Sequence, residues 1–405
     1  LTATGAGGTT TASATVAVAA FTVPVIQSFT ASPSSLPPGG DASTLAWSVT
    51  GAQLTLTIDH GVGDVTGLSS KSVTLAATTT YQLTASAPAG SATSNITVTV
   101  AAPSTQVKAW GSNDIGQLGL GNANSPQPSP VTLSNSGDIT AISGGEFFTL
   151  FLKANGTVAA AGDNQYGQLG DGTSGIPRIS PVPAIGVSNV IAISAGRFHS
   201  LALLADGTVM AWGRDLEGQL GGAGALGGAT PGTVPGLSNV IAIDAGGFHS
   251  LALKADGTVW AWGSTNQGQL GNGVSGGFGS QGAPVQAGVG VAGFNNIIAI
   301  SAGETHSIAL KSDGTVWVFG SNVNGEVGNG VPGGNQSVPV QNSSLTGISQ
   351  IGAGWHFNVA LKPDGTVFAW GFNVRGEMGN GTTDPTGCQC HATPAQTSIA
   401  NVVDI

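Results

Sequence analysis

Short runs of alternating apolar and polar residues recur along the whole chain, separated by segments rich in glycine, proline and threonine. Residues 11–18 carry alanine or valine at every second position, which is the period of a β-strand. Residues 26–32, 44–49 and 80–85 show related patterns. Short alternating runs bounded by turn residues predict an all-β chain.

The composition favours strands over helices and excludes one class of partner. Only 7% of the 405 residues are charged, against about 25% in an ordinary soluble domain. Long helices need such residues for solubility and for side-chain pairing. The formal net charge is −10, whereas nucleic-acid binding needs a basic face. We therefore expect no long helices and no nucleic-acid partner.

The sequence contains neither a recognisable membrane span nor a secretion signal. It has no strongly apolar run of about eighteen residues, the length that indicates a membrane helix. It begins at Leu1 without a basic segment, so no signal peptide is visible and we expect a mature or trimmed product. The charge-poor surface, rich in serine, threonine and glycine, favours an extracellular or cell-surface location in a bacterial protein.

The N-terminal part of the chain contains an internal repeat. Residues 1–20 are identical to residues 83–102 at 10 of 20 positions, with an offset of 82. Residues 83–100 are expected to form the last hairpin of a domain spanning residues 21–102. We therefore predict that residues 1–20 are the last hairpin of a preceding, similar domain.

The complete copy, residues 21–102, has the pattern of a β-sandwich. Trp47 and Tyr81 are the aromatic candidates for its core, and no cysteine pair supports it. The segment between Pro33 and Gly40 is expected to be a turn. This copy resembles the immunoglobulin-like and fibronectin-like modules that bacterial surface proteins carry in tandem. The resemblance implies the role of a stalk or spacer.

A second repeat, with a period of about fifty residues, begins near Val107. Six copies start with an aromatic residue or alanine before a glycine, at Trp110, Ala161, Trp212, Trp262, Phe319 and Trp370. A Gly-Gln-Leu-Gly motif or a variant follows each of them, and Asp-Gly or Asn-Gly pairs recur further along. These pairs are expected to form two-residue hairpin turns, which require positive φ. Each copy thus holds about four antiparallel strands, which form one blade of a β-propeller.

These motifs and a recurrent Ala-Gly-x-x-His segment resemble the regulator of chromosome condensation repeat family over residues 107–405. The resemblance implies a propeller, assigned here to residues 103–405, with seven blades in the full chain. Six repeat starts and 23 strands can be counted in the sequence. We therefore expect a propeller truncated at the C-terminus, in a slice of a longer polypeptide. A ring closed by a strand from a neighbouring chain is the alternative.

Histidines recur at one position of the blade. They are His199, His249 and His306, and two other blades have Phe148 and Phe357 there. A metal site would not accept phenylalanine, so the repeat predicts that these histidines serve packing.

A cysteine pair and loop carboxylates are the other candidates for metal chemistry. Cys388, Cys390 and His391 fall short of the four ligands of a zinc site. They predict an exposed loop, with a vicinal disulfide or a crosslink as further options. Asp163 and Asp171 are expected to shape turns rather than to bind calcium. The sequence also lacks the nucleophile, phosphate-loop and metalloprotease motifs. We expect no enzyme activity, no cofactor and no metal.

A binding face is expected where the blades vary most. Each of five blades has two variable residues just before the histidine position, and radial blades would place these residues around one mouth of the propeller. The candidate binding residues are Glu146, Phe147, Arg197, Phe198, Phe248, Glu304, Thr305, Trp355 and His356, with Gly247 as the tenth position. Aromatic residues, arginine and glutamate suit a protein or glycan contact. Alternatively, the three phenylalanines plug the narrow end of the ring.

Three functions follow from this organisation. The leading hypothesis is an extracellular structural or adhesive protein, in which tandem sandwiches display the propeller on a cell surface or pack it into a filament or surface layer. Its partners would be a protein, a glycan or copies of itself. The alternative is a soluble protein-binding module, such as a propeller-type enzyme inhibitor. Exchange-factor activity on a small GTPase, the eukaryotic role of the resembled family, ranks third.

Overall fold

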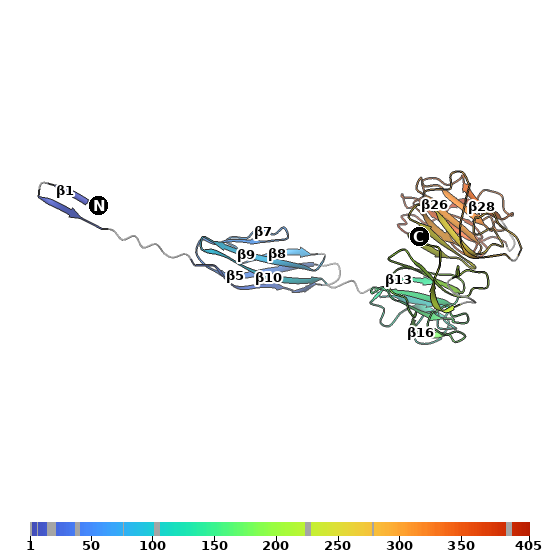
Figure 1. Cartoon of the computed structure of the whole chain (residues 1–405), viewed down its shortest axis with the longest axis horizontal. Coiled ribbons are helices and arrows are strands. Elements are labelled where there is room, and N and C mark those ends of the chain that lie inside the picture. Colours follow the sequence, from blue (N-terminus) through green and yellow to red (C-terminus); the bar gives the residue numbers. More distant parts are fainter. Residues whose placement is uncertain are drawn as a thin grey trace. The chain divides into compact units, whose positions relative to one another are not determined.

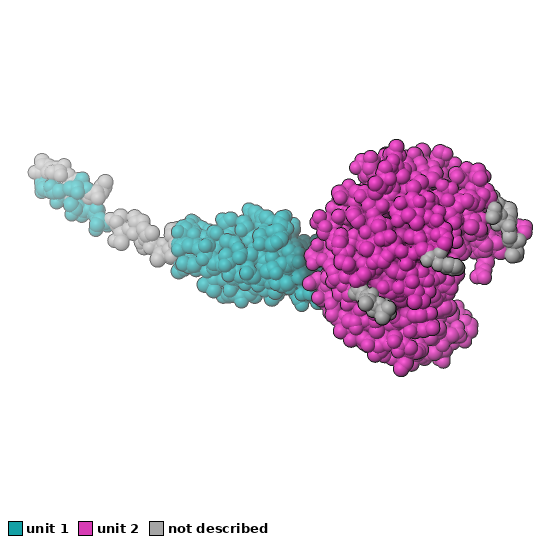
Figure 2. All heavy atoms as spheres, turned by 45° about the vertical axis from the view of Figure 1, so that its right-hand side comes forward, with its two compact units in different colours: residues 1–104 teal, residues 105–405 magenta. Residues whose placement is uncertain are grey.

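The computed structural model describes residues 2–5, 7–13, 22–36, 41–75, 77–100, 106–222, 228–277, 279–385 and 391–405. Every regular element in these ranges is a β-strand, which confirms the all-β prediction (Figure 1). The chain divides into two compact units, residues 1–104 and 105–405 (Figure 2). Residues 101–105, where the sequence predicted the domain boundary, lie outside the described ranges.

Both copies of the N-terminal repeat form a β-hairpin. β1 (Thr2–Gly5) and β2 (Gly8–Thr11) pair antiparallel, with Thr2 opposite Thr11. β9 (Thr79–Ala87) and β10 (Gly90–Val100) pair in the same register, with Thr84 opposite Thr93. The offset of 82 residues therefore preserves the strand pairing as well as the sequence.

Two sheets of the first unit enclose one hydrophobic core. Their strand orders are β3-β5-β8 and β4-β10-β9-β6-β7. Trp47 and Tyr81 lie in this core, as predicted, with Leu45 and Leu83. The indole of Trp47 donates a hydrogen bond to the Leu68 carbonyl, 3.0 Å away. The remaining strands are β3 (Val25–Ser32), β4 (Ser35–Leu36), β5 (Asp41–Thr50), β6 (Thr55–Ile58), β7 (Gly63–Asp64) and β8 (Ser70–Leu75).

One part of the sandwich prediction was incomplete. The segment after Pro33 was expected to be a turn, but Ser35 and Leu36 form β4 and pair in parallel with Thr99 and Val100 of β10. The Leu36 side chain is buried in the core, and this burial outweighs the turn-forming residues around it.

The second unit is built from successive antiparallel sheets. Among the described residues, β11 pairs with β12, and five four-stranded sheets follow in strict chain order. This order, in which each strand pairs with the next, is that of propeller blades. The strands are β11 (Lys108–Gly111), β12 (Gln127–Thr132), β13 (Ile139–Gly144), β14 (Phe148–Lys153), β15 (Val158–Gly162), β16 (Arg178–Pro183), β17 (Val190–Ala195), β18 (His199–Leu204), β19 (Val209–Gly213), β20 (Gly228–Thr233), β21 (Val240–Ala245), β22 (His249–Lys254), β23 (Val259–Ser264), β24 (Ser280–Gln286), β25 (Ile297–Ala302), β26 (His306–Lys311), β27 (Val316–Gly320), β28 (Gln336–Asn342), β29 (Gln350–Ala353), β30 (Phe357–Leu361), β31 (Val367–Gly371) and β32 (His391–Gln396).

The sequence indicated 23 propeller strands, and the last of them, at the C-terminal end of the described residues, does not form. Residues 401–405, which match the start of β21 in sequence, are not a strand in the structure. They nevertheless lie beside β29, where the Gln350 side chain contacts the carbonyl of Val403 at 3.3 Å and the amide of Ile405 at 3.1 Å. The segment has no backbone pairing with a neighbouring strand, so it is not itself a β-strand.

The Asp-Gly turns also differ from the prediction. Only the glycine of each pair has positive φ, as at Gly207 with 79°, so these are not the two-residue turns with two positive φ values. The Gly207 amide donates to the Leu204 carbonyl at 2.9 Å. The Asp206 carboxylate accepts the Thr208 amide at 2.9 Å. Aspartate is therefore favoured here because it captures a backbone amide, and only glycine is needed for the left-handed position.

The core of the propeller lies between successive sheets. Leu201 and Leu203 of β18, for example, pack with Val240 and Trp262 of the next sheet. The Trp262 indole donates to the carbonyl of Gln219 at 2.8 Å. The Trp212 indole donates in the same way to the Gln168 carbonyl, and the Trp370 indole to the Glu326 carbonyl. In these repeats the Trp-Gly motif therefore recurs in step with the Gly-Gln-Leu-Gly type motif of the preceding repeat.

The recurrent histidines also join neighbouring sheets. His199 is fully buried, and its Nε2 lies 2.9 Å from Ser250 Oγ of the next sheet. The serine hydroxyl donates to the carbonyl of Gln219 at 2.9 Å, so the imidazole is the donor to the serine. Burial lowers the pKa of His199 to about 3, which keeps the ring neutral. These contacts agree with the predicted packing role.

Candidate functional site

Five loops of the propeller surround one cavity. These loops follow β13, β17, β21, β25 and β29, and the first strand of each sheet lines the cavity wall. The cavity has a volume of about 270 Å³. Its rim carries the first variable residue of each blade, namely Glu146, Arg197, Gly247, Glu304 and Trp355. We call this rim, together with the second variable residue of each loop, the mouth.

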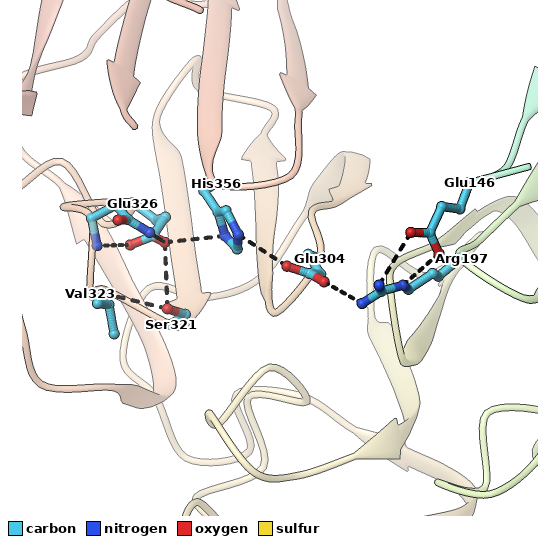
Figure 3. Close-up of polar contacts among 8 residues, drawn as sticks. Glu146, Arg197, Glu304, Ser321, Val323, Glu326 and His356 are labelled. Atoms are coloured by element: carbon cyan, nitrogen blue, oxygen red, sulfur yellow. Dashed lines mark hydrogen bonds and ion pairs between the residues drawn. The ribbon is translucent and has the colours of Figure 1, made fainter. Parts of the chain in front are cut away.

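Arg197 ties three blades together across the mouth (Figure 3). Its Nε lies 2.7 Å from Glu146 Oε2, and a second nitrogen lies 3.2 Å from Glu146 Oε1. Its third nitrogen lies 2.8 Å from Glu304 Oε1. Glu304 belongs to the second blade beyond that of Arg197, so the guanidinium reaches past the blade between them. The hydrogen bond with Glu146 raises the pKa of Arg197 further.

Three aromatic rings enclose the same guanidinium. Its central carbon lies 5.2 Å from the ring centre of Phe198, 5.3 Å from that of Phe248 and 5.5 Å from that of Trp355. These distances fall within the range of cation–π attraction. Trp355 remains 54% exposed, so part of its surface is free for contact with another molecule.

His356 continues the polar network toward the next carboxylate (Figure 3). Its Nε2 lies 3.0 Å from Glu304 Oε2, and its Nδ1 lies 3.9 Å from Glu326 Oε1. The hydrogen bond with Glu304 raises the pKa of His356 and lowers that of Glu304. Glu326 is fully buried, and its Oε2 accepts the backbone amide of Asn324 at 2.8 Å.

A carboxyl group forms part of the cavity floor. Asp244 Oδ1 accepts the hydroxyl of Ser194 at 2.7 Å, and its Oδ2 accepts the amide of Ala302 at 2.8 Å and the hydroxyl of Ser301 at 3.1 Å. Burial raises the pKa of Asp244, although these hydrogen bonds oppose the rise. The carboxyl bridges three blades, so its first role is structural.

A second arginine supports the aromatic rings from outside the cavity. The guanidinium carbon of Arg214 lies 5.3 Å from the ring centre of Phe248, 5.8 Å from that of Phe198 and 5.7 Å from that of Tyr166. Its charge is balanced by Glu217, 2.7 Å away. The two phenylalanines are therefore fixed between two cations and cannot turn away from the mouth without losing both contacts.

The predicted mouth residues divide into two groups. The first residues of the pairs line the cavity, whereas none of the second residues does. Phe198, Phe248 and His356 contact the network around Arg197 from the side. Phe147 is 40% exposed, and Thr305 contributes its backbone carbonyl to a hydrogen bond with the Ser321 amide.

Sequence reasoning missed three members of the network. Asp244 stands where the neighbouring inner strands carry serine, and Glu326 stands where four other repeats carry glutamine. Arg214 occupies a loop position that varies between repeats. A departure from the repeat consensus toward a carboxylate was the signal that could have identified Asp244 and Glu326.

The described residues provide no metal cluster and no chain segment that could cross a membrane as a helix. Cys388 and Cys390 lie outside the described ranges, while His391 pairs with Asp384 at 3.1 Å. Asp171 accepts the Thr173 amide at 3.0 Å and pairs with Arg178 at 2.8 Å, as expected for a residue that shapes a turn.

Comparison with known families identifies the propeller. The regulator of chromosome condensation (RCC1) repeat model matches residues 106–152, 155–203, 206–253, 256–310, 313–361 and 364–405. The chain belongs to this family. The RCC1 match confirms the predicted propeller and its six repeats, while the immunoglobulin-like identity of the first unit stays a prediction.

Relatives in the RCC1 family have diverse roles. The chain is 29% identical over 282 residues to the ultraviolet-B receptor UVR8 of Arabidopsis thaliana, covering 68% of this chain and 63% of that receptor. It is 35% identical over 249 residues to the probable E3 ubiquitin-protein ligase HERC6 of Homo sapiens, covering 60% of this chain and 19% of the ligase. The chain therefore spans less than two thirds of either relative.

Solved structures agree at the level of the fold. Prp20p of Saccharomyces cerevisiae superimposes with a TM-score of 0.64 at 23% identity, over 78% of this chain and 75% of Prp20p. Human WBSCR16 superimposes with a TM-score of 0.60 at 23% identity, over 72% of this chain and 78% of that protein. At this identity the likeness establishes the fold alone.

Proposed function

We propose that this chain is a non-catalytic binding protein whose propeller mouth holds a protein or glycan partner. The observation that carries the proposal is the concentration of variable, contact-forming side chains on one rim. Arg197 and Trp355 both lie on this rim, and Trp355 is an exposed tryptophan, a type that dominates binding energy in interfaces. A partner's own surface would cover the exposed part of Trp355 and exclude water from the ion pairs.

The division between fixed and variable positions supports a binding role. Gly196 precedes Arg197 and cannot carry a side chain, because a Cβ there would lie 2.6 Å from the Gly246 carbonyl oxygen. The first residue after this glycine lines the cavity and is Glu, Arg, Gly or Trp in the five blades, and no two blades carry the same pair of residues there. Rigid walls with varied rim residues are a usual design for recognition.

We also propose that the first unit presents the propeller outside the cell, as a stalk or as part of a surface layer. The hairpin register shared by β1–β2 and β9–β10 supports tandem sandwich domains. The charge-poor composition, with 7% charged residues, supports an extracellular, bacterial setting. In such a setting, copies of the same chain are a further class of partner.

A binding array tests the proposal. Wild-type protein would be applied to immobilised glycans and extracellular matrix proteins, together with a variant carrying Glu146→Gln and Trp355→Ala. A control variant carries Ile241→Ser and Ile298→Ser, at exposed residues outside the mouth. We expect the mouth variant to lose binding at least about tenfold and the control to retain it. Equal binding by all three proteins would refute the proposal.

The same array distinguishes the alternative functions. A purified small GTPase and a panel of secreted hydrolases would be included as targets. Tight binding of a hydrolase would favour the inhibitor hypothesis. Binding of the GTPase would favour an exchange factor, since Prp20p has been characterised with its binding properties to Gsp1p and histones.

A further inference from the structure

The mouth contains a complete receptor for a guanidinium group. Glu146, Phe248, Glu304 and Trp355 come from four different blades, and all four surround the same group. The guanidinium itself comes from a fifth blade, on Arg197. The receptor and its occupant are thus contributed by separate parts of the fold, and the receptor does not depend on Arg197 for its own backbone.

The geometry of the receptor matches a guanidinium rather than a generic cation. Glu146 binds two nitrogens in the forked arrangement, at 2.7 and 3.2 Å, and Glu304 binds the third at 2.8 Å. A planar cation with donors on three nitrogens satisfies both carboxylates at once, whereas an ammonium group presents a point charge. The three aromatic rings, with centres 5.2 to 5.5 Å from the central carbon, add cation–π attraction.

The other ionic groups of the mouth favour a cation as well. Glu304 is shared between Arg197 and His356, and the buried Glu326 lies beyond His356. Removing Arg197 would leave Glu146 without its ion-pair partner and Glu304 with the imidazole alone. The two side chains are only 12% and 13% exposed, so leaving their charges uncompensated is costly, and a cation of matching shape would remove that cost.

We propose that the mouth is a guanidinium-recognition site, filled in the free chain by Arg197 and suited to an arginine side chain on a protein partner. This inference rests on the proposed function for its partner, and it selects a protein over a glycan. The Arg197 side chain is 28% exposed, so the guanidinium lies at the surface rather than inside the blade. The cavity below it offers space into which the Arg197 side chain can move when a partner's arginine takes its place.

Chemical rescue tests the site with a defined probe. Arg197→Ala removes the occupant and leaves the two carboxylates and three rings in place. N-Methylguanidinium should bind this variant at least about tenfold more tightly than it binds wild-type protein, measured by calorimetry, and should raise the Tm of the variant. N-Methylurea, which has a similar shape but no charge, should do neither.

Two further variants keep the test decisive. Glu304→Gln in the Arg197→Ala background removes one carboxylate and should abolish the gain from N-methylguanidinium. Arg197→Met keeps more of the side-chain packing, and it serves as the empty site if Arg197→Ala does not fold. If N-methylguanidinium binds the emptied site no better than wild type, or if N-methylurea binds equally well, the proposal is overturned.

The rescue experiment and the binding array test different claims, so either one can fail while the other succeeds. If N-methylguanidinium rescues the variant but the array shows no role for the mouth, the guanidinium site stands and the proposed partner at the mouth is refuted. If the array finds a partner that needs the mouth but N-methylguanidinium gives no rescue, the binding face stands and guanidinium recognition is refuted. An arginine on the partner is then tested by its replacement with citrulline, which should weaken binding at least about tenfold.

Discussion

At the scale of single residues, the buried histidines make the fold sensitive to acid. Burial lowers the pKa of His249 to about 3, whereas an unfolded histidine titrates near about 6.5. The unfolded chain therefore binds more protons below that pH. The stabilisation is complete above about 6.5 and is lost as the pH falls toward 3, at up to about 1.4 kcal/mol per pH unit for each such histidine.

His249→Phe tests this account, because Phe148 fills the equivalent place in another blade. The substitution should cost about 1 kcal/mol at neutral pH, through loss of the hydrogen bond to Ser307. It should also flatten the fall in the free energy of unfolding between about pH 6.5 and pH 4. Denaturant unfolding at several pH values measures both effects. An unchanged pH slope in the variant would contradict the burial of a neutral imidazole.

His356 should show the opposite dependence. Its pKa in the folded state is raised by Glu304, so its stabilisation is complete below about 6.5 and is lost as the pH rises through the folded-state value. His356→Gln should therefore destabilise the protein more in mild acid than in mild alkali. Unfolding free energies of the wild type and the variant, compared across that range, check the sign. A difference that grows with pH would contradict the ion pair.

Residues that pack the repeated blades could be predicted from the sequence more readily than residues that form the mouth network. His199 recurs with the blade, so its packing role followed from the pattern. The link from Arg197 to Glu304 joins positions 107 residues apart, on blades that are not neighbours in sequence. Only the arrangement of successive sheets around the mouth brings such residues together, and no local pattern encodes that approach.

At the scale of elements, the contacts between blades depend on glycine as much as on aromatic residues. A Cβ on Gly246 would overlap the ring of His249 and would lie 2.6 Å from the Gly303 carbonyl oxygen. The imidazole ring of His249 is fully buried, and the Gly303 carbonyl belongs to the loop of the next blade. Neither group has room to move away from the added Cβ. This contact accounts for the glycine in the Ala-Gly-x-x-His motif.

Gly246→Ala should therefore destabilise the propeller by about 3 kcal/mol or more. Gly282→Ala in β24 is the matched control, since a Cβ there meets no atom within 4 Å. The control should change the free energy of unfolding by less than about 0.5 kcal/mol. Denaturant unfolding of both variants measures the difference. Equal effects would mean that the glycine serves a different purpose.

Turns and short strands were the elements least accessible to sequence reasoning. Asp206-Gly207 was predicted to be a turn, and it is one, but the capture of the Thr208 amide by Asp206 made a second positive φ unnecessary. Likewise, β4 forms after a proline because Leu36 finds a place in the core. In both cases a specific tertiary or side-chain contact decided between local conformations of similar energy.

At the scale of the whole molecule, the two units should unfold separately. The core of the first unit is drawn from residues 26–100 alone. Trp47→Ala removes a large side chain from it and should lower the stability of that unit by about 3–5 kcal/mol. Calorimetry should show one transition moving to lower temperature while the propeller transition stays in place. A shift of both transitions together would contradict independent cores.

The central claim is that recognition takes place at the mouth, and photo-crosslinking tests it most directly. A benzophenone amino acid would replace Phe147, an exposed aromatic residue of the mouth, in one variant and Ile298, which lies outside the mouth, in another. Each variant would be irradiated with a protein partner identified by the array. We predict that the partner is crosslinked from position 147 and not from position 298. Crosslinking from position 298 alone would contradict the account and would move the binding face away from the mouth.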